Sequence, residues 1–94
     1  MTPTTPSNRA PYTIHIDRSA EKTLRKQPRT VAARLIKAIF ALADDPHPPS
    51  SRKLEGYDFL NRLRVGDWRV IYDVESGRLV VRVLKIGPRG GVYE

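Results

Sequence analysis

The sequence predicts a small α+β domain with the element order β-α-α-β-β-β, in which a helical hairpin packs on one face of an antiparallel sheet. Three observations support this prediction. Apolar residues alternate near the start, recur at helical spacing in the middle, and dominate three strand-like segments in the second half. A chain of 94 residues suffices for one domain with a modest core, so we expect no second domain.

The first eleven residues differ in composition from the rest of the chain. Residues 1–11 hold three of the eight prolines and almost no apolar side chains, which predicts a disordered tail followed by a folded domain over residues 12–94. The segment that follows alternates, with Tyr12, Ile14 and Ile16 on one face. This pattern predicts a half-buried first strand.

A first helix is expected over roughly residues 20–27. Asp17 or Ser19 can cap it by accepting backbone N–H bonds that lack partners in the first turn. Glu21 and Arg25 are four positions apart, which favours a weak stabilising ion pair on the helix surface.

A second helix follows Pro28, which ends the first helix, and Thr30 can cap it. An apolar stripe at helical spacing predicts its buried face, and two further apolar residues widen that stripe. The stripe comprises Val31, Leu35, Ile39 and Leu42, and the widening residues are Ile36 and Phe40. Two short helices with a tight connection suggest an antiparallel hairpin.

Three strands are expected after a proline-rich loop over residues 44–51. They span residues 54–65, 68–74 and 79–86, separated by the turn signals Gly66-Asp67 and Ser76-Gly77. These strands should form an antiparallel meander. The first strand must join the same sheet, because a lone strand cannot satisfy its backbone hydrogen bonds.

The charge balance points to a polyanionic partner. Lys and Arg number 17 against 10 Asp and Glu, a formal charge of +7, which favours nucleic acid first. The absence of cysteine excludes disulfides and thiolate metal sites. The N-terminal segment lacks the apolar core of a signal peptide, and no apolar run reaches the ~20 residues of a membrane helix. We therefore expect a cytoplasmic protein with no membrane association.

Arginines gather on the expected open face of the sheet. Arg62 and Arg64 should project together from one strand, on the side opposite Leu63 and Val65. Arg69 should face away from the large apolar residues of the next strand and lie near Arg62. Two further residues, Arg89 and Tyr93, follow the last strand and can fold back over this face.

Such a face suits metal-independent RNA cleavage. Attack of a 2′-hydroxyl passes through a phosphorane-like state, whose extra negative charge fixed guanidinium groups stabilise. A tyrosine can stack on a base or assist proton transfer. His15 and His47 are the only histidines, and the Asp44, Asp45, His47 cluster lacks zinc-site spacing, so we expect no metal and no cofactor. The alternative is a solvated arginine surface without a ligand.

Two segments resemble the RelE/ParE toxin superfamily. They are KLEGY, from Lys53 to Tyr57, and RLRVGDWRVIY, from Arg62 to Tyr72. With the final strand, the arginine loop and the C-terminal tyrosine, the resemblance covers about residues 12–93. It implies a RelE-like fold and a toxin with a cognate antitoxin. RelE-type members cleave mRNA in the ribosomal A site, so it also implies mRNA and the ribosome as partners.

The resemblance also implies roles for individual residues. Arg62 matches a basic position of the catalytic face, and Arg69 matches the arginine that contacts the scissile phosphate. Arg89 matches the arginine associated with the leaving group, and Tyr93 matches the tyrosine that stacks or assists proton transfer. Around these four residues, RNA binding is expected from Lys53, Arg64 and Arg82.

Two departures from the family pattern leave alternatives open. Leu60 stands where some RelE members have a lysine, and Pro88 stands where many relatives have histidine or lysine. No histidine then remains as an obvious general base, and a guanidinium is always protonated. The alternatives are a ParE-type inhibitor that binds DNA gyrase without nuclease activity, and a non-catalytic RNA- or ribosome-binding module.

Overall fold

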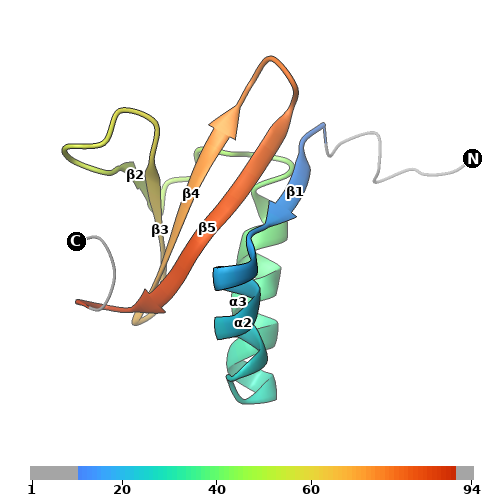
Figure 1. The fold of residues 1–94 in the computed structure, drawn as a ribbon, viewed down its shortest axis with the longest axis vertical. Coiled ribbons are helices and arrows are strands. Elements are labelled where there is room, and N and C mark those ends of the chain that lie inside the picture. The colour runs from blue at the N-terminus through green and yellow to red at the C-terminus, as the bar shows by residue number, and fades with distance from the viewer. Residues whose placement is uncertain (1–10, 91–94) are drawn as a thin grey trace, which may run out of the picture.

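The computed structural model describes residues 11–90, which form two helices and a five-stranded sheet (Figure 1). The elements in chain order are β1 (Thr13–Ile16), α2 (Arg18–Arg25), α3 (Arg29–Ala41), β2 (Ser51–Lys53), β3 (Asn61–Val65), β4 (Trp68–Glu75) and β5 (Val80–Pro88). This arrangement confirms the predicted α+β class. The predicted tail up to Ala10, and Tyr93, lie outside the described residues.

The sheet has the strand order β1-β5-β4-β3-β2. Strands β2 to β5 pair antiparallel with their neighbours, as the turn signals predict, whereas β1 runs parallel to β5 with Thr13 opposite Val80. The prediction of a wholly antiparallel sheet is therefore wrong for this one pair. Short turns fix the direction of the strands they connect, but the helical hairpin separates β1 from the sheet, so no local signal sets its direction.

The long strand expected over residues 54–65 is divided. Only Asn61–Val65 is extended, and a short strand that the sequence did not reveal, β2, pairs with it at its edge. Gly56 between them has a φ of +85°, which is incompatible with a continuous strand. The Leu54 N–H donates to the Leu60 carbonyl at 2.9 Å and closes the intervening loop.

The helices begin at other residues than expected. α2 starts at Arg18 with Asp17 at the N-cap position, but no side chain caps it. α3 starts directly after Pro28, so Thr30 lies inside the helix and does not cap it. A proline suits this boundary because its fixed φ is compatible with a helix start and its missing N–H would have no partner there. The predicted pair of Glu21 and Arg25 is present at 3.4 Å.

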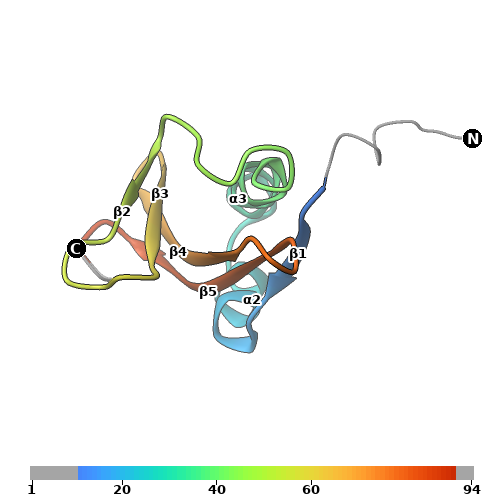
Figure 2. The same cartoon turned by 90° about the horizontal axis from the view of Figure 1, so that it is seen from above.

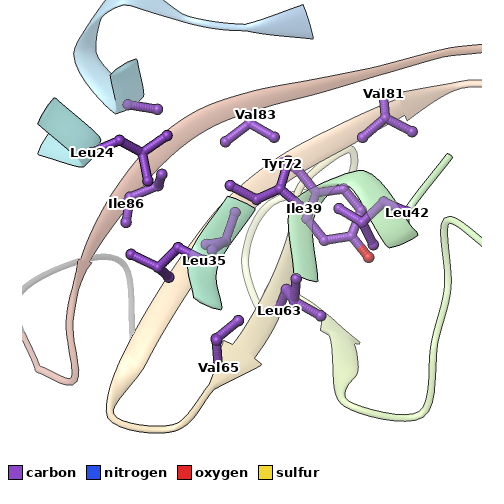
Figure 3. Close-up of a cluster of buried hydrophobic side chains, with 12 residues drawn as sticks. Leu24, Leu35, Ile39, Leu42, Leu63, Val65, Tyr72, Val81, Val83 and Ile86 are labelled. Atoms are coloured by element: carbon purple, nitrogen blue, oxygen red, sulfur yellow. The ribbon is translucent and has the colours of Figure 1, made fainter. Parts of the chain in front are cut away.

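Both helices bury their apolar stripes against one face of the sheet. The sheet curves around α3 (Figure 2). The side chains of Leu35 and Ile39 on α3, and of Leu42 directly after it, point toward those of β3, β4 and β5 (Figure 3). Ile36 and Phe40 do not belong to this stripe, because they remain 39% and 51% exposed. Within residues 11–90, no helix is long and apolar enough to cross a membrane.

Candidate nucleic-acid interface

A cavity of about 180 Å³ lies on the sheet face that the helices leave uncovered. Its lining consists of Pro49, Ser50, Arg52, Arg62, Arg64 and Arg69. Four of these six residues are arginines, and none of the described residues that line it is acidic. A cavity with this lining favours a polyanionic ligand.

Strand register explains why the arginines meet. Arg64 is directly opposite Arg69 in the β3–β4 pair, and Arg52 is directly opposite Arg62 in the β2–β3 pair. Residues directly opposite in an antiparallel pair project from the same face. Arg62 and Arg64 therefore share a face, as predicted, and Leu63 between them is buried on the other side. The direct cross-strand partner of Arg69 is Arg64, and Arg62 lies two residues away from Arg64 on β3.

Arg69 is buried, with only 9% of its surface exposed. Its Nη1 donates hydrogen bonds to the Gly66 carbonyl at 3.1 Å and to the Trp68 carbonyl at 3.0 Å. Arg69 thus lies on the open face as predicted, but it is not a solvated surface arginine, because carbonyls of the adjacent turn hold its guanidinium against the backbone. Hydrogen bonds from a charged donor fix its direction, so Arg69 contributes a preorganised charge to the cavity.

The β3–β4 turn is itself fixed from both sides of the sheet. Gly66 has a φ of +61°, as the first central residue of a type II′ hairpin turn requires. The guanidinium of Arg34, from α3, fills the space that a side chain at Gly66 would need, and its Nη2 would lie 2.6 Å from an added Cβ. The turn that orients Arg69 therefore also contacts α3.

Arg52 is the site residue that sequence reasoning missed. The predicted RNA-binding residue next to it, Lys53, pairs with Asn61 and so projects from the opposite face. Recognition of β2 as a strand would have distinguished the two, because side chains alternate along it. The RNA-binding role of Lys53 stays a prediction without support from this cavity.

Arg82 lies elsewhere on the open face. It forms a two-point ion pair with Asp73, at 2.8 and 3.1 Å, and this hydrogen-bonded carboxylate raises the pKa of Arg82 above its ordinary value. In the β1–β5 pair it is opposite His15. Arg82 therefore does not join the four arginines of the cavity.

Arg89 lies at the same end of the sheet as Arg64 and Arg69. Its backbone N–H donates to the Asp67 carbonyl in the β3–β4 turn at 2.7 Å, and its side chain is exposed. It does not line the cavity itself. The structure thus brings Arg89 near the cavity, whereas Tyr93 lies outside the described residues.

The proline-rich loop beside the cavity is anchored to the sheet. The Tyr72 hydroxyl donates to the Pro46 carbonyl, and the Ser51 hydroxyl donates to the Pro48 carbonyl, both at 2.7 Å. Burial raises the pKa of Tyr72 above its ordinary value. In the same loop Asp45 accepts a hydrogen bond from the His47 backbone, and across residues 11–90 no three potential metal ligands gather.

Comparisons with known proteins place this fold among bacterial and archaeal toxins. Residues 14–93 match the family described as the ParE toxin of the type II toxin–antitoxin system parDE. Toxin RelE of Mycobacterium tuberculosis is 32% identical over 87 residues, covering 88% of this chain and 87% of the relative.

Two solved structures share the fold. The archaeal RelE–RelB complex from Pyrococcus horikoshii OT3 has a chain 33% identical, with a TM-score of 0.76 over 87% of this chain and 99% of that one. A chain of the intact E. coli RelBE toxin–antitoxin complex is 29% identical, with a TM-score of 0.70 over 82% of this chain and 95% of that one.

Proposed function

The chain belongs to the RelE/ParE superfamily of toxins from type II toxin–antitoxin systems, and on that premise we propose that it is a metal-independent endoribonuclease that cleaves mRNA on the ribosome. The observation that carries the proposal is the arginine-lined cavity on the uncovered face of the sheet. A ligand there must be anionic, and a backbone phosphate fits the planar donors of guanidinium groups.

The proposed reaction is an internal transfer at phosphorus. The 2′-oxygen of one nucleotide forms a bond to the adjacent phosphorus while the bond to the 5′-oxygen of the next nucleotide breaks. The proton of the 2′-hydroxyl passes to solvent water, and the departing 5′-oxygen takes up a proton from water or from a side chain beside it. Arg69, held by two backbone carbonyls, stabilises the additional charge on the phosphoryl oxygens as this exchange proceeds.

Proton transfer has a smaller role in this proposal than charge stabilisation. An arginine cannot accept the 2′-hydroxyl proton, because the guanidinium stays protonated. Arg89 and Tyr93 remain the proposed groups for the departing oxygen, on their positions in the family pattern. Positioning of the message by the ribosome supplies the attack geometry, since orientation alone lowers such barriers by several kcal/mol.

The proposed protein partner is an acidic antitoxin segment with apolar anchors. Ile36 and Phe40 of α3 line an apolar groove with Ile16 and Leu24, and the chain carries a net charge of +7. The solved relatives are complexes of RelE with RelB, which supports a cognate partner for this chain. Since ribosomes and messages lie in the cytoplasm, we propose that the toxin acts there.

The test is induction of the toxin followed by primer extension on cellular messages, with purified ribosomes and naked mRNA compared in vitro. We expect cuts on ribosome-bound messages and none on naked mRNA. Arg89→Ala should lose about 10²-fold in cleavage, and Tyr93→Phe should lose less than Tyr93→Ala if stacking matters more than the hydroxyl. Uncut messages in a toxic culture would contradict the nuclease proposal.

A second candidate function is inhibition of DNA gyrase by binding. One observation favours it, namely that the matching family is described as the ParE toxin. A supercoiling assay with purified gyrase separates the two functions. Loss of supercoiling with intact messages would make gyrase inhibition the leading function.

A further inference from the structure

Arg52 and Arg62 form a like-charged pair at the edge of the sheet. They are direct cross-strand partners in the β2–β3 ladder, and both line the cavity. Like charges directly opposite each other destabilise a sheet. Within residues 11–90, no carboxylate lies at ion-pair distance from the exposed Arg52 side chain. Arg52 therefore faces a like charge across the ladder, and no carboxylate within residues 11–90 offsets its own charge.

A second like-charged pair lies next to the first. Arg64 and Arg69 are direct partners in the β3–β4 ladder and line the same cavity. Arg62 and Arg64 are two residues apart on β3, which separates the two pairs by about 7 Å along the strand. The cavity thus offers two neighbouring groups of guanidinium donors. A single anion would need only one such group.

We propose that Arg52 and Arg62 bind a second backbone phosphate of the RNA strand, next to the phosphate held by Arg64 and Arg69. This inference rests on the proposed nuclease function and adds a binding residue to it. Arg52 holds the strand on the β2 side of the site, so that the reacting phosphate lies at Arg69. Its effect is on the binding and position of RNA, and the chemical step remains with Arg69.

The experiment measures binding of a 2′-O-methyl RNA oligonucleotide, which cannot be cleaved, by fluorescence anisotropy at several salt concentrations. Arg52→Gln should weaken binding about threefold to tenfold near 0.1 M salt and reduce the salt slope by up to ~0.7. Arg52→Lys should recover part of this loss, since it restores charge without the planar fork. The matched control is Lys22→Gln on α2, an exposed side chain outside the cavity, for which we expect a change below about twofold.

Thermal unfolding without RNA distinguishes a binding role from a structural one. Arg52→Gln should raise Tm by about 1–4 °C relative to Lys22→Gln, because it removes a like-charged cross-strand pair. Added inorganic phosphate should stabilise the wild type more than Arg52→Gln. A lower Tm for Arg52→Gln, or RNA binding equal to that of Lys22→Gln, would overturn the inference.

The same measurements separate this inference from the proposed function. Message cleavage by the wild type together with unchanged binding by Arg52→Gln would refute the second phosphate site alone. Weaker RNA binding by Arg52→Gln together with no message cleavage by the wild type would refute the proposed nuclease activity. The proposed second phosphate site would then still stand.

Discussion

At the scale of single residues, Arg69 combines two roles that a surface arginine does not have. It lines the cavity of four arginines, while its Nη1 donates hydrogen bonds to the carbonyls of Gly66 and Trp68. The guanidinium is therefore held in place by the protein itself, and the same contacts tie the turn together. A substitution at Arg69 must affect both the site and the fold.

Arg69→Ala should lose about 10²-fold or more in message cleavage, because one preorganised charge donor contributes ~3 kcal/mol to such a transition state. It should also lower the free energy of unfolding by about 1–3 kcal/mol, since two carbonyls lose a charged donor. Primer extension and thermal melting measure the two effects. Arg69→Lys separates them, because it keeps the charge without the planar donors. Full cleavage by a folded Arg69→Ala variant would exclude Arg69 from the reaction.

Tyr72 ties the sheet to the proline-rich loop through its hydroxyl. Tyr72→Phe leaves the Pro46 carbonyl without this donor and should lower stability by about 1 kcal/mol at neutral pH. Burial raises the folded-state pKa, so the unfolded chain loses the tyrosine proton first, near pH 10. The stabilisation is thus present below about pH 10 and is lost as pH rises through the folded pKa. Denaturant unfolding should show the difference between wild type and Tyr72→Phe narrowing above that pH.

At the scale of elements, the β4–β5 connection contains strain at an unexpected residue. The predicted turn signal is Ser76-Gly77, yet the left-handed residue is Leu79, with a φ of 55°. The Leu79 carbonyl accepts a hydrogen bond from Thr13 at 2.8 Å, which ties β1 to this loop. The backbone conformation is held by that contact and by the parallel pairing of β1 with β5.

Leu79→Asn should raise the free energy of unfolding by about 0.5–1 kcal/mol, because asparagine tolerates a left-handed backbone that strains leucine. Leu79 is 44% exposed, so the substitution removes little apolar burial. Leu79→Val, which is β-branched, should instead lower stability. Chemical denaturation of the wild type and the two variants measures their order of stability. A Leu79→Val variant as stable as Leu79→Asn would contradict backbone strain at Leu79.

The antitoxin proposal belongs to the groove between α2 and α3. Phe40 lines this groove and is 51% exposed, so Phe40→Asp should leave the fold nearly unchanged. The same change should weaken the complex with an acidic partner by at least about tenfold, since it replaces an apolar anchor by a repelling charge. Calorimetric titration with the product of the neighbouring gene measures this. Lys37→Asp, on the same helix but outside the groove, is the control for charge alone.

Sequence patterns predicted those elements whose signals are local. The turn at Gly66 sets the antiparallel pairing of β3 with β4, so the strand meander is predictable. The apolar stripe of α3 sets which side of that helix is buried, so the helix is predictable as well. The parallel direction of β1 and the edge strand β2 depend on pairings between distant segments, which no local pattern encodes. The site follows the same division. Alternation predicted the shared face of Arg62 and Arg64, whereas the choice of Arg52 over Lys53 required the register of a three-residue strand.

At the scale of the whole molecule, charge is distributed unevenly over the two faces of the sheet. One face is covered by helices and forms the apolar core, and the uncovered face carries the four cavity arginines. Arg82 on this same face is paired with Asp73, so the positive potential is concentrated toward the β2–β3–β4 side. With a net charge of +7, the molecule should attract RNA from a distance and orient it toward that side.

This distribution predicts a steep salt dependence of RNA affinity. Each phosphate neutralised on a single strand contributes a slope of about −0.7 to log K against log salt, so two bound phosphates require a slope of about −1.4 or steeper. Anisotropy titrations between about 50 and 300 mM salt measure it, since exposed charges are increasingly screened over that range. Arg64→Gln should make the slope shallower by up to ~0.7, while Arg78→Gln, at an exposed ion pair with Glu75, should change it less. An affinity independent of salt would mean that RNA binds elsewhere, because contacts to guanidinium groups on this face release counterions when they form.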